Sequence, residues 1–174
     1  MEYLFTLKYQ LSEQDSNQDD IVERLGAAGC DDALIGIGQP GRIALAFTRE
    51  ADSAQAALLS ALADVKHVVP SASLIEAAPD FVGLTDVADV VGMTRQNMRK
   101  LMVNHATSFP PPVHDGSSAV WHLADVLKWL LARGPYRVAA GVAEMAETTK
   151  QVNLAKAAPA LAPGMQRQLQ GLLV

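Results

Sequence analysis

Residues 84–104 constrain the fold more than any other stretch of this chain. They read LTDVADVVGMTRQNMRKLMVN, in which apolar positions recur at helical spacing on both sides of a central glycine. Thr85 is the expected N-cap of a helix over residues 86–91, and Asp86 lies in its first turn, where a carboxylate is favourable. The pattern predicts two short helices joined by a tight turn.

The turn and the second helix depend on a few particular residue types. Gly92 is expected to take a positive φ, which costs little only in glycine. Thr94 is the expected N-cap of the second helix, and the small Ala88 allows the two helices to cross closely. The remaining inward positions are apolar: Val87, Val91, Met93, Met98, Leu101 and Met102. Together these offsets are typical of a helix-turn-helix.

The outer surface of the second helix carries side chains suited to reading DNA. Because the inward positions are assigned, the exposed ones follow: Thr94, Arg95, Gln96, Asn97, Arg99 and Lys100. Gln and Asn can form two hydrogen bonds with adenine, and Arg can do so with guanine. We therefore predict that residues 94–103 read the major groove. An ordinary solvated helix in a small helical bundle is the alternative.

An extended segment, a turn and a third helix are expected next. Pro110–Pro112 exclude helix, and Asp115-Gly116 is a turn signal. Val120 and Trp121 are the expected return strand, which leads into an amphipathic helix with Leu123, Val126, Leu127, Leu130 and Leu131 on its apolar face. The tip holds three further candidate DNA contacts, His114, Ser117 and Ser118, since serine hydroxyls can donate to phosphate oxygens. A solvent-facing turn is the alternative for them.

Residues 82–133 resemble the AlpA and excisionase branch of the MerR-like winged helix-turn-helix proteins. The resemblance lies in LTDVADVVGMTRQNMRKLMVN followed by FPPPVHDGSSAVWHLADVLKWL: a Phe-Pro loop, a strand, a Gly/Ser tip, a strand that ends in an aromatic residue, and a helix that ends in Trp-Leu. It implies a winged DNA-binding domain over residues 81–134. That family usually carries more Arg and Lys around the wing than this tip does.

The first 78 residues follow a β-α-β-β-α-β pattern. One face of the first strand is expected to hold Tyr3, Phe5, Leu7 and Tyr9. The expected helix caps are Asn17 or Asp19, and then Asp52 or Ser53. Gln39-Pro40-Gly41 marks a hairpin, and residues 67–77 are the expected last strand, edged by Pro70. This order matches the ferredoxin-like arrangement, in which domains commonly dimerise or sense ligands.

The charge is unevenly distributed along the chain. The net charge is −5, but residues 1–80 alone carry −8, whereas residues 81–134 carry +1 and residues 135–174 carry +2. The expected DNA-binding domain is therefore only mildly basic. Since phosphate contacts dominate affinity for DNA, a single copy should bind weakly, and we expect a homodimer.

The segments on either side of this domain are expected to be a linker to the N-terminal domain and a helical C-terminal extension. Residues 77–80 are the expected seam, Gly134-Pro135 ends the third helix, and Tyr136–Ala158 is expected to form a long helix. A short amphipathic end follows over Met165–Leu173. Two roles stay open for this extension over residues 135–174: self-association, or packing back on the N-terminal domain.

Several other functions are not expected. Cys30 is the single cysteine, which excludes an intramolecular disulfide and a thiolate cluster for zinc. His105, His114 and His122 lie on three different predicted elements, so no metal site is expected. No serine has the surroundings of a nucleophile, and Gly36, Gly38 and Gly41 flank a hairpin turn and do not open a helix. We therefore expect neither an enzyme nor a cofactor.

The expected architecture is an α+β protein with three parts. These are an acidic ferredoxin-like domain over residues 1–78, a central winged helix-turn-helix, and a C-terminal helical extension. No apolar run approaches the roughly 20 residues that span a bilayer, and a cytoplasmic location without membrane contact is expected. The expected function is a homodimeric, sequence-specific repressor bound to double-stranded DNA. The alternative is an antitoxin- or phage-related adaptor that binds a protein partner through the acidic domain.

Overall fold

The computed structural model describes residues 1–15, 17–170, 172 and 173 of the 174-residue chain. The expected α+β class is confirmed. The strands are β1 (Glu2–Gln10), β2 (Ala33–Gly36), β3 (Arg42–Glu50), β4 (Ser73–Ala78), β5 (Phe81–Val82) and β6 (Trp121–His122). The α-helices are α1 (Gln18–Ala27), α2 (Ala54–Val68), α3 (Leu84–Val90), α4 (Arg95–Asn104), α5 (Leu123–Leu131), α6 (Val142–Ala157) and α7 (Pro163–Leu169). Two short 3-10 helices are η1 (Glu13–Asp15) and η2 (Ala158–Ala160).

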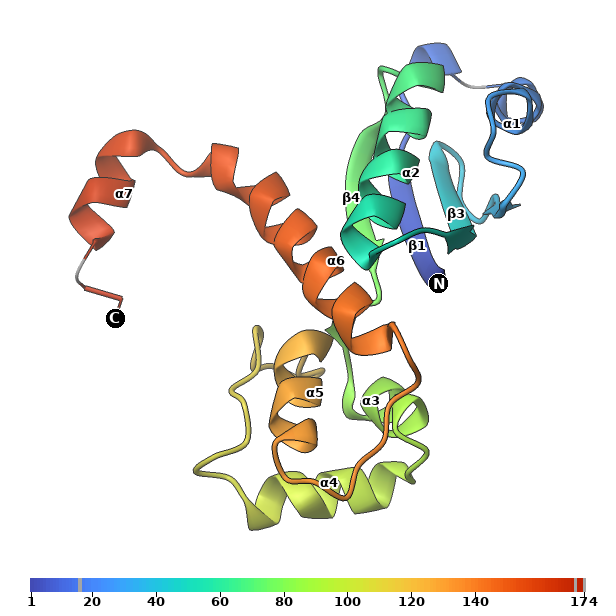
Figure 1. Ribbon diagram of the computed structural model, residues 1–174. Coiled ribbons are helices and arrows are strands. Elements are labelled where there is room, and N and C mark those ends of the chain that lie inside the picture. Colours follow the sequence, from blue (N-terminus) through green and yellow to red (C-terminus); the bar gives the residue numbers. More distant parts are fainter. Residues whose placement is uncertain (16, 171, 174) are drawn as a thin grey trace.

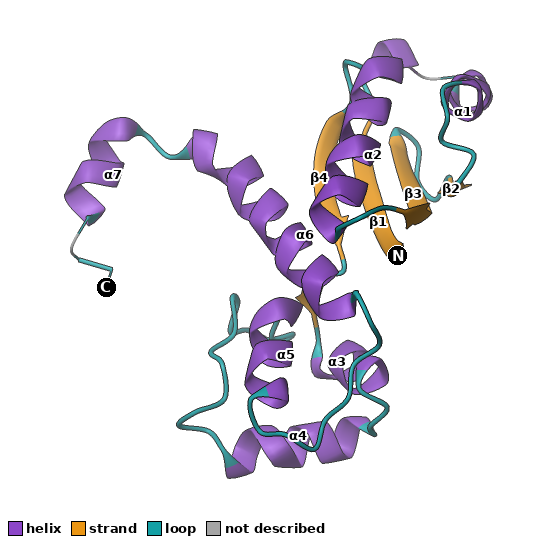
Figure 2. Cartoon of the chain, viewed as in Figure 1, coloured by secondary structure: helices purple, strands orange, loops and turns teal. Residues whose placement is uncertain are grey.

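The N-terminal unit is a four-stranded antiparallel sheet with two helices on one face (Figure 2). Its elements follow the expected order, β1-α1-β2-β3-α2-β4, and the strands lie in the order β2-β3-β1-β4. The predicted alternation in β1 is confirmed, because Tyr3, Phe5, Leu7 and Tyr9 are all buried beneath the helices. Their register partners in β3 place Ile43, Leu45 and Phe47 on the same face.

Both helix caps of this unit fall on one of the two expected residues. Asn17 accepts a hydrogen bond from the backbone N–H of Asp20, and Ser53 accepts one from Ala56. The strand predicted over residues 67–77 is wrong at its start, since α2 continues to Val68 and β4 begins at Ser73. Val65 and Val69, four residues apart, are both buried on the helix side, so the valine run belongs to the end of a helix.

The second unit, which we call the helical module, comprises residues 81–134. Three helices, α3, α4 and α5, surround a separate apolar core, and the two-residue strands β5 and β6 pair beside it. The predicted return strand is shifted by one residue, because Trp121 and His122 pair with Phe81 and Val82. Val120 forms only an isolated bridge with His114. The pairing with β5 has no local signal in the sequence.

Helix α6 joins the two units. It packs against α2, β1 and β4 on one side and against α5 on the other (Figure 1). Its adjacent residues Met145 and Ala146 are buried in the two different cores. Of the two roles left open for the extension, α6 therefore takes the packing role.

The long helix predicted over Tyr136–Ala158 is wrong at its start, and the amphipathic end predicted from Met165 contains a helix, α7, that begins at Pro163 and ends at Leu169. Helix α6 begins at Val142 and not at Tyr136, because Gly141 has a φ of 81° and ends an irregular segment. An added Cβ at Gly141 would lie 3.1 Å from the Tyr3 ring, so a glycine permits this close approach. Beyond η2, α7 extends away from both units (Figure 1), and Leu161 and Met165 are exposed along the way. None of the helices in the described part of the chain has the length and apolarity to span a bilayer.

Candidate nucleic-acid interface

The first helix of the helical module starts two residues earlier than predicted. Gly83, and not Thr85, occupies the N-cap position of α3, and the Asp86 carboxylate accepts a 2.8 Å hydrogen bond from the Gly83 N–H. This bond is the half of a capping box that runs from the N-cap N–H to the carboxylate at the third helical residue, and Thr85 lies exposed inside the helix. Val87 and Ala88 are buried as expected.

The turn between α3 and α4 has the predicted geometry. Gly92 has a φ of 68°, and the Met93 N–H donates to the Ala88 carbonyl at 2.8 Å. Thr94 then caps α4, since its hydroxyl accepts a hydrogen bond from the Asn97 N–H at 3.2 Å. These contacts fix the direction of α4 relative to α3.

Helix α4 presents a polar and cationic outer face. Met98 is fully buried and Leu101 and Met102 are half-buried, so the buried stripe is as predicted. All six expected contact residues of this helix are exposed: Thr94, Arg95, Gln96, Asn97, Arg99 and Lys100. The helix contains no carboxylate, so nothing within it offsets the positive end of its dipole.

None of the four carboxylates of the helical module lies on α4 itself. Asp86 caps α3, and Asp125 on α5 forms a 2.6 Å ion pair with Lys150 on α6. Asp89 and Asp115 lie on α3 and on the wing tip. The net charge of +1 for the module therefore understates how basic the outer face of α4 is.

The predicted wing is a short loop between α4 and β6. Val113 and Val120 are joined by a 2.7 Å backbone hydrogen bond, and His114 and Val120 form a bridge. Gly116 allows the His114 ring to fold over the tip, since an added Cβ would lie 2.5 Å from its Nε2 atom. Ser117 and Ser118 are exposed, as is His114. The structure thus gathers the six α4 residues on one helix and places the three tip residues on a separate loop.

An aromatic cluster holds this loop against the module. The Trp121 indole N–H donates to the Pro110 carbonyl at 3.1 Å, and Phe109 packs edge-on against Trp129 with a centroid distance of 5.0 Å. The start of the proline segment is therefore fixed against the module. Trp129 is half-buried and packs against the core of the module.

Arg133 is a further exposed cation near α4 that no sequence pattern indicates. Its guanidinium lies 4.0 Å from the centre of the Trp129 ring and donates to the Ser108 hydroxyl at 2.9 Å. The side chain stays exposed just beyond the C-terminal end of α4. No spacing rule links residue 133 to residue 108, so only the packing of α5 against the α4–β6 loop reveals it.

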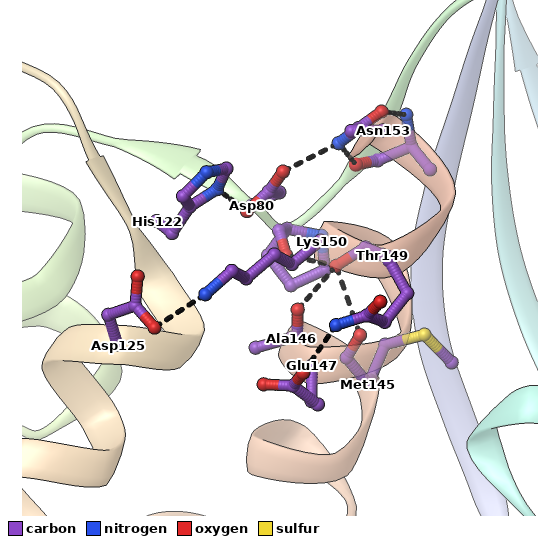
Figure 3. Close-up of polar contacts among 12 residues, drawn as sticks. Asp80, His122, Asp125, Met145, Ala146, Glu147, Thr149, Lys150 and Asn153 are labelled. Atoms are coloured by element: carbon purple, nitrogen blue, oxygen red, sulfur yellow. Dashed lines mark hydrogen bonds and ion pairs between the residues drawn. The ribbon is translucent and has the colours of Figure 1, made fainter. Parts of the chain in front are cut away.

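The predicted seam over residues 77–80 is instead a buried polar joint (Figure 3). Asp80 is 1% exposed, and its two carboxylate oxygens lie 2.7 Å from the His122 Nδ1 atom and the Asn153 Nδ2 atom. The Thr149 hydroxyl donates to the Pro79 carbonyl at 2.6 Å. The joint thereby links the sheet, the helical module and α6, so the candidate interface is held in a defined orientation.

No protein-family model, curated protein or solved structure matches this chain.

Within the described residues, no three His, Cys, Asp or Glu side chains are close enough together to hold a metal ion. Cys30 is buried, and burial raises the pKa of its thiol, so it is held in the unreactive protonated form. His105 packs against the Trp129 ring, and His122 belongs to the joint.

Proposed function

We propose that this protein is a sequence-specific, DNA-binding transcription regulator that acts as a homodimeric repressor. Residues 94–103 would enter the major groove, where Arg95, Gln96 and Asn97 at the start of α4 reach base edges. Arg99 and Lys100 would contact phosphates, as would His114, Ser117 and Ser118 on the wing.

The observation that carries this proposal is the composition and support of the outer face of α4. Three cations and two amides are exposed on a helix without a carboxylate, and that helix is anchored by the buried Met98 and the Thr94 cap. The acidic sheet lies at the opposite end of the molecule (Figure 1), so its charge is kept away from the approaching phosphates. The alternative, an ordinary solvated helix, gives no reason for the acidic sheet to lie far from the outer face of α4.

The arrangement of elements supports two finer assignments of fold. The strand order β2-β3-β1-β4, with both crossing helices on one face, favours a ferredoxin-like N-terminal unit. The caps and turn of α3 and α4, together with the β5–β6 pairing, favour a winged helix-turn-helix of the AlpA and excisionase kind. In that case Arg133, beside the C-terminal end of α4, is a further candidate phosphate contact.

Selection of duplexes from a random pool, followed by an anisotropy titration of the enriched sequence, tests the proposal. The double variant Arg95→Ala/Arg99→Ala should weaken binding at least about tenfold and leave the unfolding transition unchanged. Lys66→Ala/Arg167→Ala is the matched control, because it removes the same charge from α2 and α7. Equal affinity of the wild type and the α4 variant would contradict the proposal.

The second candidate function is a protein-interaction adaptor. It is favoured by the net charge of −8 on residues 1–80, which suits a basic protein surface. Under this alternative the random pool would yield no enriched sequence, and Arg95→Ala/Arg99→Ala would have no effect on the partner complex.

A further inference from the structure

The sheet of the N-terminal unit has one open face. The helices cover the face that holds Tyr3 and Phe5, whereas the alternate residues of β1 and β3 point the other way. Two large apolar side chains stand out there, since Leu4 is 67% exposed and Leu34 is 78% exposed. Between them on β3 lie the smaller Ala46 and Thr48, and Leu4, Leu34 and Ala46 line a shallow hollow of about 410 Å³.

The two ends of this open face carry opposite charges. Glu2 and Glu50 lie directly opposite each other on β1 and β3, and like charges in this position repel. At the other end, Arg42 lies opposite Gln10, whereas Lys8 forms a 2.8 Å ion pair with Glu76 of β4, so the positive charge of this end rests on Arg42. The face is therefore apolar in the middle, acidic at one end and basic at the other.

The centre of this pattern is the Thr6–Ala46 pair. It lies four residues from the Glu2–Glu50 pair and four residues from the Gln10–Arg42 pair. A two-fold axis between the two facing sheets, perpendicular to the strands at this point, would place Arg42 of each copy over Glu50 of the other. The same ion pair would therefore form twice. An axis parallel to the strands would instead place the acidic end of one copy over the acidic end of the other, where they would repel. The charge pattern thus selects the arrangement in which the strands of the two copies run in opposite directions.

We propose that the open face binds a second copy of this chain, with the strands of the two sheets reversed. Leu34 lies level with the axis, because its register partner is Ala46, so Leu34 of each copy meets its equivalent across the interface. Four strands of this length offer roughly 500–600 Å² per copy, or roughly 1,000 Å² in total, which is at the lower bound for a specific interface. The interface accordingly forms a reversible dimer.

The strand reversal determines where the two helical modules lie. Ala78 at the end of β4 pairs with Thr6, so the chain leaves the sheet toward the Glu2–Glu50 end. The modules of the two copies therefore leave from opposite ends of the paired sheets. This consequence rests on the proposed function: each module would engage its own segment of duplex, and the dimer would bring two segments together, unlike dimers that read half-sites one helical turn apart.

Charge reversal tests the interface on the protein alone, independently of whether it binds DNA. Sedimentation equilibrium should give a dimer for the wild type, and Arg42→Glu or Glu50→Arg should each raise the dimer Kd at least about tenfold. Dimerisation should return in the double variant Arg42→Glu/Glu50→Arg, and also when the two single variants are mixed in equal amounts. Arg42 and Glu50 are roughly 27 Å apart along β3, so this rescue can occur only between copies.

Two further measurements distinguish loss of this interface from loss of the fold and from association through α7. The thermal unfolding of each variant should match that of the wild type, which excludes a loss of fold as the cause of a weaker dimer. Met165→Asp on the exposed α7 should leave the dimer unchanged. A monomeric wild type at roughly 100 μM, single variants without effect, or a loss of dimer that neither mixing nor the double variant restores would each overturn the proposal. So would a dimer lost only in Met165→Asp.

Discussion

Asn153 on α6 forms two hydrogen bonds with the backbone of Ala77 on β4, one from the Ala77 N–H at 2.9 Å and one to its carbonyl at 2.8 Å. The side-chain amide thus pairs with an edge strand in the way that a neighbouring strand would. Lys156 donates to the Ile75 carbonyl on the same edge. Helix α6 therefore covers an edge that would otherwise be open to pairing with another chain.

Replacing Asn153 should destabilise the protein strongly. Asn153→Leu would keep the volume but leave three buried groups without a partner: the Ala77 N–H, the Ala77 carbonyl and one oxygen of Asp80. We expect a loss of about 3 kcal/mol in the free energy of unfolding, measured by urea denaturation. Gln151→Ala on the exposed side of α6 is the control and should cost less than about 0.5 kcal/mol. Equal effects of the two changes would show that the joint is not a stabilising contact.

The cap of α4 can be tested separately from its outer face. Thr94→Ala removes the hydroxyl that accepts from the Asn97 N–H and should cost about 1 kcal/mol of stability. Thr94→Ser retains the hydroxyl and should stay close to the wild type. Chemical unfolding of the three proteins measures this difference, and an alanine variant as stable as the serine variant would argue against the cap.

Arg49 is a buried cation held by two carboxylates, and its loss should be costly. It forms two hydrogen bonds with Asp32, at 2.7 and 3.0 Å, and one with Asp64 at 2.7 Å. The bonds to Asp32 raise the pKa of the guanidinium, so it stays charged. Arg49→Met should cost about 2–3 kcal/mol in urea denaturation, because two partly buried carboxylates lose their partner. Arg49→Lys should fall between the wild type and the methionine variant, since lysine cannot form the bidentate pair; a lysine variant as unstable as the methionine variant would contradict this.

Stability should fall at alkaline pH, and Tyr9 should account for part of the loss. Burial raises the pKa of the Tyr9 phenol, so the folded state retains a proton that the unfolded state releases near pH 10. The contribution of Tyr9 is complete below about pH 10 and is lost as the pH rises toward the folded value. Free energies of unfolding at about pH 8 and about pH 11 should differ less in Tyr9→Phe than in the wild type. An equal decline in both proteins would contradict the assignment.

If α4 binds DNA as proposed, its cations should determine the salt dependence. Arg99→Ala should reduce the slope of log K against log salt by about 1, because one phosphate contact and its released counterion are lost. Gln96→Ala should leave the slope unchanged and relax the preference at one base pair. Titrations of the selected duplex at several salt concentrations measure both quantities, and identical slopes for the two variants would contradict the division of roles.

The sequence was sufficient for features that depend on residues within one or two turns of each other. The alternation of Tyr3 and Phe5, the positive φ of Gly92 and the cap by Thr94 all follow from local period and local hydrogen bonds. For the same reason the exposure of Arg95 and Arg99 was predictable, since burying Met98 leaves the opposite side of the helix in solvent.

Only the tertiary structure determined which polar residues are buried by contacts with residues far away in the chain. Asp80 reads as a linker residue, yet it is buried because His122 and Asn153 arrive from two other elements. Thr149 and Asn153 interrupt the apolar stripe on α6, but their partners are backbone groups of the β4 edge and the residue after it. A polar group can be buried where a partner from a distant part of the chain completes its hydrogen bonds. The apolar periodicity of the sequence does not indicate such a partner.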